Sequence, residues 1–396
     1  PIERAPVPEE IAILLVQHFG APCTPLIKKK TEVKEGDLIG QVEAGLGANI
    51  HSSATGTVKN IGKAPHPISV TAPAVTIKVD PDAQPPSYEP RDWKSLSREE
   101  LLEAVKRAGI VGIGGAGFPT HVKLSPPSEA KVDTLILNGA ECEPYLTTDH
   151  RLMLEHSREG IEANKMDAVE AMEKAVAESN SNGFHIQVDA LQVKYPQGSE
   201  KQLIQSITGR KVPGFGLPFD VGVIVQNVGT TKAIYDAVVL NKPLYEKVIT
   251  VSGKGINRPA NLLVRIGTRI ADIVDYLGGV KRDLSKVVLG GPMMGFAVPS
   301  LDVPVTKTTS GILFLTKEEI DTKPHGQCIR CGWCIKACPM GLSPNEIGIY
   351  VEAGKAEETS QFGVFECFEC GCCAFVCPAK RPLVQFIRLA KSKAKK

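Results

Sequence analysis

Short apolar runs separated by turn residues form the first part of the chain. Strand-like runs at 11–16 and 75–79 enclose several turns that contain glycine. This spacing predicts a small β domain over residues 1–80. Prolines between 81 and 93 then predict a linker, because proline fixes φ and lacks an N–H donor. The sequence starts at Pro1, so we expect the natural N-terminus to lie upstream.

From residue 94 the pattern changes to alternating helices and strands. Ser97 followed by glutamates predicts a helix start. Three apolar runs predict strands, the first of them a buried parallel strand. The alternation predicts a Rossmann-like α/β domain over residues 94–245. The predicted strands are 132–137, 185–194 and 221–225, and the predicted helices are 97–108, 149–178, 201–208 and one that begins after 231.

Polar segments follow each of these three strands. In open α/β sheets, ligands bind in a crevice beyond the carboxyl ends of the strands, so the loops predict one site served by several segments. Glu141 and Glu143 could there hydrogen-bond a flavin ring edge, a ribose or a nicotinamide amide. The alternative is that these acids mark a helix start, where the helix dipole favours them. The polar segments are 138–144, 195–200 and 226–231.

A glycine-rich segment precedes the first predicted strand. Residues 112–120 read GIGGAGFPT, with four glycines in six positions. Glycines leave the backbone bare, so its N–H groups can approach an anionic or planar ligand. The segment lacks the dinucleotide fingerprint in its usual place after a first strand. A glycine turn that packs a helix against a strand is the alternative.

Residues 246–315 return to strand character. Runs at 248–253 and 287–292 flank a short helix within 265–277, which predicts a small α+β unit. It contains no constellation of acid, base and nucleophile. Met293 and Met294 follow a Gly-Gly-Pro turn, and we expect them to fill the core.

Eight of the eleven cysteines form two identical runs with the spacing C-x2-C-x2-C-x3-C-P. In such runs three thiolates hold one [4Fe–4S] cluster and the fourth reaches the neighbouring cluster. Zinc prefers paired CxxC knuckles, and disulfides suit small secreted chains. Cys372 interrupts the second run and is predicted to be a packed thiol. The predicted ligands are Cys328, Cys331, Cys334 and Cys377 for the first cluster, and Cys367, Cys370, Cys373 and Cys338 for the second.

The charge balance limits the possible functions. The chain has 46 Lys and Arg against 44 Asp and Glu, which argues against a nucleic-acid-binding surface. No apolar run of 18 residues is present. Cysteines committed to clusters indicate a reducing, cytoplasmic compartment. The C-terminal lysines Lys391, Lys393, Lys395 and Lys396 predict a solvated tail, with contact to an anionic membrane surface as the alternative.

The segment from residue 31 to 62 resembles the barrel-sandwich fold of lipoyl and biotinyl carriers. In those carriers a lysine lies at the hairpin tip. The corresponding tip here, at 45–49, has no lysine. A structural or docking role is therefore expected in place of a swinging arm.

The whole chain resembles the C subunit of the Rnf complex, the membrane-bound ferredoxin:NAD oxidoreductase. The stretches that carry the resemblance are GIGGAGFPTHVKL, NGAECEPYLTTDHRLM, GGPMMG and the two cysteine runs. The central part is also similar to the flavin-binding NADH dehydrogenase subunit of respiratory complex I, which reads GRGGAGFPTGLKW and NADESEP. The resemblance implies a β-grasp domain over residues 246–315 and a helical two-cluster ferredoxin-like domain over 316–396.

The same resemblance implies an FMN site and an NAD(H) site. FMN would lie over the glycine loop, with Asn138 and Glu141 at the isoalloxazine ring and Glu143 on the nicotinamide side. Lys123 would lie near a phosphate, and Phe118 would stack on the nucleotide. Ile113, Ala140 and Ser199 differ from the complex I pattern. The implied cofactor-binding residues are Gly114, Gly115, Gly117, Phe118, Lys123, Asn138, Glu141, Glu143, Tyr195, Gly198, Glu200, Gln226, Asn227 and Thr230.

The implied function is electron transfer between NAD(H) and two [4Fe–4S] clusters through FMN, with Glu141 and Glu143 as the catalytic side chains. A flavin is expected on chemical grounds too, because nicotinamides exchange hydride whereas clusters take single electrons. The implied partners are the other Rnf subunits, with ferredoxin reached indirectly, at the cytoplasmic face of a bacterial or archaeal cell membrane. The rival interpretation is an electron-relay and docking subunit without a nucleotide site. A diaphorase subunit of a soluble hydrogenase or formate dehydrogenase would share the flavin core but not the barrel-sandwich segment or the two-cluster tail.

Overall fold

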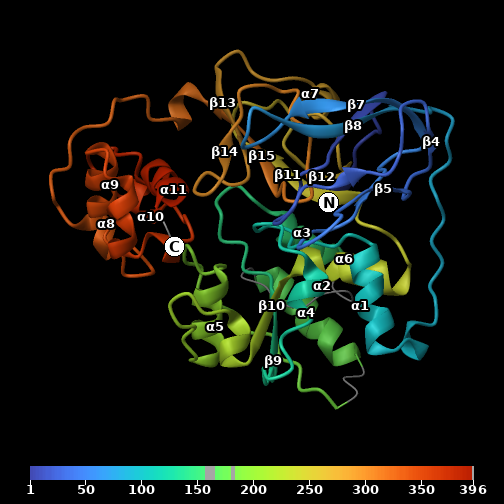
Figure 1. Cartoon of the computed structure of the whole chain (residues 1–396), viewed down its shortest axis with the longest axis horizontal. Helices are drawn as coiled ribbons and strands as arrows, with labels where there is room; N and C mark the ends of the chain where they lie inside the picture. The colour runs from blue at the N-terminus through green and yellow to red at the C-terminus, as the bar shows by residue number, and fades with distance from the viewer. Residues whose placement is uncertain (157–165, 180–182, 395–396) are drawn as a thin grey trace.

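The computed structural model describes residues 1–156, 166–179 and 183–394, which fold into four units (Figure 1). The blue N-terminal β unit and the orange and yellow β-grasp unit lie side by side. The cyan-to-green flavin-domain unit lies beneath them, and the red helical unit lies at one end. The chain is therefore a mixed α/β and α+β protein with several domains, as the sequence predicts. No helix in these described residues is long and apolar enough to cross a bilayer.

The N-terminal unit is a sandwich of two small sheets. Alternating apolar positions such as Ile11, Ile13 and Val75 face inward because side chains of a strand alternate between its two faces. One sheet has the order β2 (Glu10–Leu14), β8 (Thr71–Val79), β7 (Gly56–Pro65), β4 (Glu32–Val33). The other has the order β3 (Thr24–Pro25), β5 (Leu38–Gln41), β6 (Ile50–His51).

The β-grasp unit is a six-stranded mixed sheet with α7 (Ile270–Tyr276) packed in its apolar core. Its first strand comes from the start of the chain, because β1 (Ile2–Arg4) pairs in parallel with β12 (Ala260–Arg265). The first few residues thus contribute to this sheet and not to the sandwich. The remaining strands are β11 (Glu246–Ser252), β13 (Leu284–Leu289), β14 (Phe296–Ala297) and β15 (Gly311–Thr316), followed by the 3-10 turn η4 (Lys317–Glu319).

The flavin-domain unit begins at η1 (Trp93–Ser95), after the proline-rich segment, and α1 (Arg98–Arg107) has the predicted capping box between Ser97 and Glu100. Its parallel sheet contains only β9 (Thr134–Asn138) and β10 (Val223–Asn227) among the described residues. The other elements are α2 (Thr120–Lys123), α3 (Thr148–Glu155), α4 (Met166–Glu178), α5 (Glu200–Thr208), η3 (Pro218–Val221) and α6 (Val228–Val239).

Two strand predictions for this unit need correction. Residues 185–194 pair with no strand of the described chain, although their apolar and polar residues alternate. None of their side chains is fully buried, and Val188 and Leu191 pack against two different apolar clusters, so the segment lacks a single packed strand face. The first strand is not fully buried, since Leu135 is 59% exposed. The predicted helix over 149–178 corresponds to α3 and α4, and 157–165 between them lies outside the described residues.

The C-terminal unit consists of short helices around an apolar core that includes Ile347, Val364 and Ile387. Lys391 and Lys393 belong to the last helix rather than to a solvated tail, and Lys395 and Lys396 lie outside the described residues. Lys391 is held there because its Nζ donates to Glu369 Oε1 at 2.8 Å. The elements are α8 (Trp333–Lys336), α9 (Pro344–Glu352), η5 (Ala356–Phe362), η6 (Val364–Glu366), α10 (Cys372–Phe375) and α11 (Leu383–Lys393).

Candidate flavin pocket and cluster sites

The glycine loop is anchored at both ends and bare in between. Gly112 N donates to Phe118 O at 2.9 Å, and Ile113 N donates to Thr230 Oγ1 at 2.9 Å. Gly114 has φ 82° and is exposed, and a Cβ on Gly115 would have no described atom within 4 Å. The backbone is therefore exposed at both positions and faces open space at Gly115, while a Cβ on Gly114 would lie 3.7 Å from Asn227 Nδ2. This geometry fits a planar or anionic ligand better than a packing turn.

Gly117 and Phe118 fix the far side of the loop against the β-grasp unit and the N-terminal unit. A Cβ on Gly117 would lie 2.8 Å from Thr308 Cγ2, so this glycine permits a close contact within the protein. Phe118 is half-buried and packs against Phe19, with ring centroids 6.0 Å apart and planes tilted by 32°. Phe118 thus already has an aromatic neighbour beside the loop.

The strand-end loops meet, as the crevice hypothesis requires. Asn138 and Asn227 are register partners at the ends of β9 and β10. Asn138 Nδ2 donates to Gly198 O at 2.9 Å, which connects the first loop to the segment before α5. Asn227 Nδ2 donates to Asp149 Oδ2 at 2.7 Å, and its Oδ1 accepts from Gly229 N at 2.8 Å as the cap of α6. Asn138, Gly198 and Asn227 therefore lie at one edge.

Two further polar groups belong to this edge. Lys123 Nζ donates to Glu200 Oε1 at 2.5 Å, and both side chains are about one-third exposed, so an incoming phosphate can compete for the ammonium. Gln226 is 4% exposed, and its Nε2 has no partner among the described residues. A buried amide nitrogen without an acceptor costs free energy unless a ligand supplies one. Together with the bare glycines, this orphan donor indicates that the residues present fit FMN.

The two predicted catalytic acids accept hydrogen bonds from backbone amides. Glu141 accepts from Asp149 N at 3.1 Å and from His150 N at 3.4 Å, at the start of α3. The alternative considered from the sequence, acids at a helix start, thus describes its contacts. Glu143 accepts from Met293 N at 3.1 Å and from Met294 N at 2.8 Å. Burial raises the pKa of Glu143, and these two amides oppose that rise.

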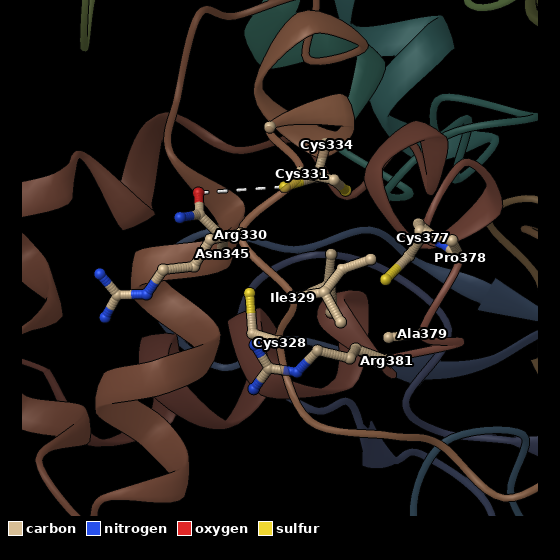
Figure 2. A pocket seen from close by; sticks show the side chains of 12 residues that line it. Cys328, Ile329, Arg330, Cys331, Cys334, Asn345, Cys377, Pro378, Ala379 and Arg381 are labelled. Atoms are coloured by element: carbon tan, nitrogen blue, oxygen red, sulfur yellow. Dashed lines mark hydrogen bonds between the residues drawn. The ribbon is translucent and has the colours of Figure 1, made fainter.

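The first group of cysteines surrounds one cavity (Figure 2). The empty space measures about 350 Å³, and Cys334 Sγ approaches Asn345 Oδ1 at 3.9 Å on its wall. The structure thus brings three thiols of the first run together with the last thiol of the second run. These four thiols belong to Cys328, Cys331, Cys334 and Cys377.

A buried cation completes this cavity. Arg381 lines it and is 2% exposed. Its Nη2 pairs with Glu352, whereas Nε and Nη1 have no hydrogen-bond partner in the described part of the chain. A guanidinium is never deprotonated in proteins, so these donors require negative charge or acceptors nearby. A thiolate-ligated iron–sulfur cluster supplies both, and the residues present fit it.

The second predicted ligand group also combines thiols from both cysteine runs. Cys338 interacts electrostatically with Cys367, Cys370 and Cys373, which are contributed by the other run. Burial raises the pKa of Cys367 to about 11 and that of Cys370 to about 12. Cluster assembly must therefore displace protons from buried thiols. Cys372 is half-buried at the start of α10. The ligand roles themselves stay predictions.

The second group lies against the flavin domain. Tyr195 OH donates to Cys370 O at 2.6 Å, and Gln202 Nε2 approaches Pro339 O at 3.5 Å. Tyr195, predicted at the cofactor, thus also contacts the backbone of a predicted cluster ligand. Figure 1 shows α10 and α11 directly above the loop that leads into α5. This arrangement places the second group in contact with the flavin-domain unit.

Several residues at these sites do not emerge from the sequence. Asp149, Arg381 and Arg388 carry no motif, and their partners are distant in the chain. The expectation that the methionines of GGPMMG fill the core is wrong. Met293 is half-buried and Met294 is 38% exposed, because their backbone N–H groups turn toward Glu143. Repeated glycines around the two methionines are the available signal of close backbone contact.

Family models match all four units. The RnfC barrel sandwich hybrid domain matches residues 1–82, and the Nuo51 FMN-binding domain matches 105–163 and 158–236. The SLBB domain matches 248–297, and the 4Fe-4S dicluster domain matches 325–381. The chain is therefore an iron–sulfur flavoprotein of electron transport, with an FMN-binding domain and a two-cluster domain in one polypeptide.

Relatives that match nearly the whole chain identify the family. The chain is 48% identical to the C subunit of the proton-translocating ferredoxin:NAD(+) oxidoreductase complex of Clostridium ljungdahlii, over 99% of this chain and 90% of the relative. It is 40% identical to the C subunit of the Na(+)-translocating ferredoxin:NAD(+) oxidoreductase complex of Acetobacterium woodii, over 97% and 90%. The C subunit of the ion-translocating oxidoreductase complex of Rhodobacter capsulatus is 40% identical, over 99% and 79%. The chain belongs to the family of Rnf complex C subunits.

A solved structure shares the fold. An NAD+-reducing [NiFe]-hydrogenase in the H2-reduced state superposes with a TM-score of 0.51 at 17% identity, over 76% of this chain and 64% of the hydrogenase chain. At this identity the likeness concerns the fold alone.

Proposed function

We propose that this chain is the NAD(H)-reacting subunit of an ion-translocating ferredoxin:NAD+ oxidoreductase complex. One observation carries the proposal: the open glycine loop and the strand-end crevice lie in the same polypeptide as the predicted cluster ligands. The two sites are in direct contact through Tyr195. Bound FMN supplies the ability to exchange hydride with a nicotinamide and single electrons with a cluster. The nucleotide site and the cluster ligands of this chain then act in one reaction.

The glycine loop and the strand-end residues would hold FMN. Gly114 and Gly115 offer backbone N–H groups, and Lys123 exchanges its contact with Glu200 for a phosphate. Asn138 and Glu141 lie where a ring edge can accept or donate hydrogen bonds, and Gln226 Nε2 gains an acceptor. The remaining cofactor-binding residues of this proposal are Gly117, Phe118, Glu143, Tyr195, Gly198, Asn227 and Thr230.

The protein's contribution to the chemistry is positioning and exclusion of water. Hydride transfer needs the nicotinamide held against the flavin, and fixed geometry supplies much of the rate. Glu141 and Glu143 are the proposed catalytic acids because they lie at the edge where the ring and the nicotinamide meet. Each is fixed by two backbone N–H groups, so its carboxylate needs little reorganisation during the reaction.

The cysteine groups would bind two [4Fe–4S] clusters. Cys338, Cys367, Cys370 and Cys373 form the flavin-proximal site, and Cys328, Cys331, Cys334 and Cys377 form the distal site. With the groups bound, these two sites would connect the flavin pocket to another subunit of the complex for single-electron transfer. Ion translocation is assigned to the partner subunits, and ferredoxin is reached through them. We place the chain peripherally at the cytoplasmic face of the membrane, where NAD(H) is available.

Anaerobic visible spectroscopy of the reconstituted protein tests this function. The protein is loaded with FMN, iron and sulfide and then mixed with NADH or NADPH. Bleaching of the flavin absorbance is the expected result. A protein that binds no FMN, or binds FMN that neither nucleotide reduces, would be a relay subunit without its own nucleotide site, and the proposal would be wrong.

A further inference from the structure

A chain of hydrogen bonds runs from Glu143 to the backbone of the second cysteine run through one loop of the β-grasp unit. We call residues 291–295 the GPMMG loop. Glu143 accepts from Met293 N at 3.1 Å and from Met294 N at 2.8 Å. Two adjacent amides on the two oxygens of one carboxylate form a clamp that fixes the loop on its flavin-domain side.

Arg388 of α11 holds the other side of the GPMMG loop. Its Nη2 donates to Met294 O at 3.3 Å, and its guanidinium lies 4.2 Å from the centroid of the Phe296 ring. Its Nε donates to Glu369 Oε2 at 2.7 Å. Glu369 lies between Cys367 and Cys370 in sequence, so Arg388 links the loop to the segment that carries two predicted ligands.

Lys391 extends this contact to a predicted ligand itself. Its Nζ donates to Glu369 Oε1 at 2.8 Å and to Cys367 O at 2.6 Å. Glu369 therefore pairs with two cations, Arg388 and Lys391, at one carboxylate.

Glycines allow the close approach on both sides of the loop. A Cβ on Gly291 would lie 2.3 Å from Glu143 Oε2, and a Cβ on Gly371 would lie 2.5 Å from Met293 O. Gly371 also has φ 82°, a conformation that favours glycine. Backbone-to-backbone contact thus joins the loop to the second cysteine run.

Resting on the proposed function, we propose that the GPMMG loop, clamped between Glu143 and Arg388, sets the position of the second cluster relative to the flavin. Arg388 is then a positioning residue for electron transfer between these two centres, while Glu143, which belongs to the proposed nicotinamide site, also anchors the loop. Each hydride taken from NADH brings two electrons, which leave singly to the second cluster and then to the first, while one proton is released to solvent. The rate of each single-electron step falls exponentially with the distance between the centres. The Arg388 side of the clamp therefore controls this step and not hydride transfer.

Hydrogen exchange in the cluster-loaded protein tests the clamp directly. Glu143→Ala removes the acceptor of both loop amides, so exchange at Met293 and Met294 should be at least about tenfold faster than in the unaltered protein. Asp321→Asn is the control, because the Asp321 carboxylate pairs with Lys380 at the surface. Its loss should leave exchange at Met293 and Met294 unchanged. Unchanged protection at both amides in Glu143→Ala would overturn the clamp.

Stopped-flow reduction by NADH tests the role of the clamp in electron transfer. The variant is Arg388→Gln, which alters no residue of the nucleotide site. Flavin bleaching should keep its rate, whereas cluster reduction should slow severalfold, since the rate of a single-electron step falls exponentially with the distance between the centres. Arg388→Lys keeps the charge and should restore part of the rate. Cluster reduction at the unaltered rate in Arg388→Gln would overturn the inference. Failure of NADH to bleach the flavin in the unaltered protein would instead overturn the proposed function.

Discussion

At the scale of single residues, Arg381 is the buried charge whose role can be tested most clearly. Two of its nitrogens lack partners among the described residues beside the cavity of the first cysteine group. A buried cation stabilises the more negative, reduced form of a cluster and so raises its potential. Arg381→Met should lower the first cluster's potential by about 60 mV or more, the one-electron equivalent of about 1.4 kcal/mol.

Redox titration followed by electron paramagnetic resonance measures that shift. The second cluster provides the internal control, because none of its predicted ligands lines the cavity that Arg381 lines. A first-cluster potential that is the same in Arg381→Met and the unaltered protein would show that the cation does not face the cluster.

A substitution at Gly115 should affect ligand binding without affecting folding. A side chain here meets no described protein atom within 4 Å, and its φ is not in the left-handed region. Gly115→Val should therefore leave the unfolding temperature of FMN-free protein unchanged, while raising the Kd for FMN at least about tenfold because the methyl groups occupy the ligand's space. A fluorescence titration with FMN measures it. Unaltered affinity would move the flavin away from this loop.

Residue-level prediction works where a motif carries its own spacing. The two cysteine runs and the glycine loop identify the thiols and bare amides that the structure gathers. It fails for Arg381 and Arg388, because a single arginine has no local pattern and its partner is chosen by the tertiary fold. Glu143 is a predicted site residue, but its clamp on the GPMMG loop joins segments about 150 residues apart.

At the scale of elements, the N-cap of α6 connects stability to the site. Asn227 Oδ1 accepts from Gly229 N and Thr230 N, and its Nδ2 reaches Asp149. Asn227→Ala should lower the unfolding free energy by about 1 kcal/mol for the lost cap. Denaturant unfolding of the FMN-free protein measures this change.

Ser199→Ala is the control for that measurement. Ser199 is the N-cap residue of α5, but its side chain makes no capping hydrogen bond. The loss should therefore be clearly smaller than for Asn227→Ala. Equal losses for the two variants would contradict the assigned role of the Asn227 side chain.

The elements themselves are predicted well where local signals agree with packing. Examples are the helix start at Ser97 and the apolar strand predicted at 221–225, which forms over Val223–Asn227. The segment 185–194 has equally good alternation and forms no strand in the described part of the chain, and none of its side chains is fully buried. Contribution of β1 to the β-grasp sheet depends on a pairing across more than 250 residues, which periodicity cannot reveal.

At the scale of the whole molecule, Lys307 joins three units. It precedes β15 of the β-grasp unit, and its Nζ donates to Asn49 O at 2.5 Å and to Gly109 O at 2.7 Å. The first acceptor lies at the tip of the N-terminal unit and the second lies just before the glycine loop. Complete burial lowers the pKa of Lys307 to about 7.

This lysine makes stability depend on pH. Its pKa is about 10.4 in an unfolded chain, so between about pH 7 and 10 the folded state binds fewer protons than the unfolded state. Its contribution to stability therefore rises with pH across that window and falls toward pH 7. The unfolding temperature should increase more between about pH 7 and 9.5 in the unaltered protein than in Lys307→Met. Parallel curves for the two proteins would contradict this linkage.

The central claim is that hydride enters at a flavin on this chain and single electrons continue through its clusters. Anaerobic stopped-flow mixing of the reconstituted protein with NADH, followed at flavin and cluster wavelengths with and without FMN, tests it most directly. We predict that flavin absorbance bleaches first, that the clusters follow, and that no cluster is reduced when FMN is omitted. Cluster reduction without FMN, or a flavin that stays oxidised, would contradict the account.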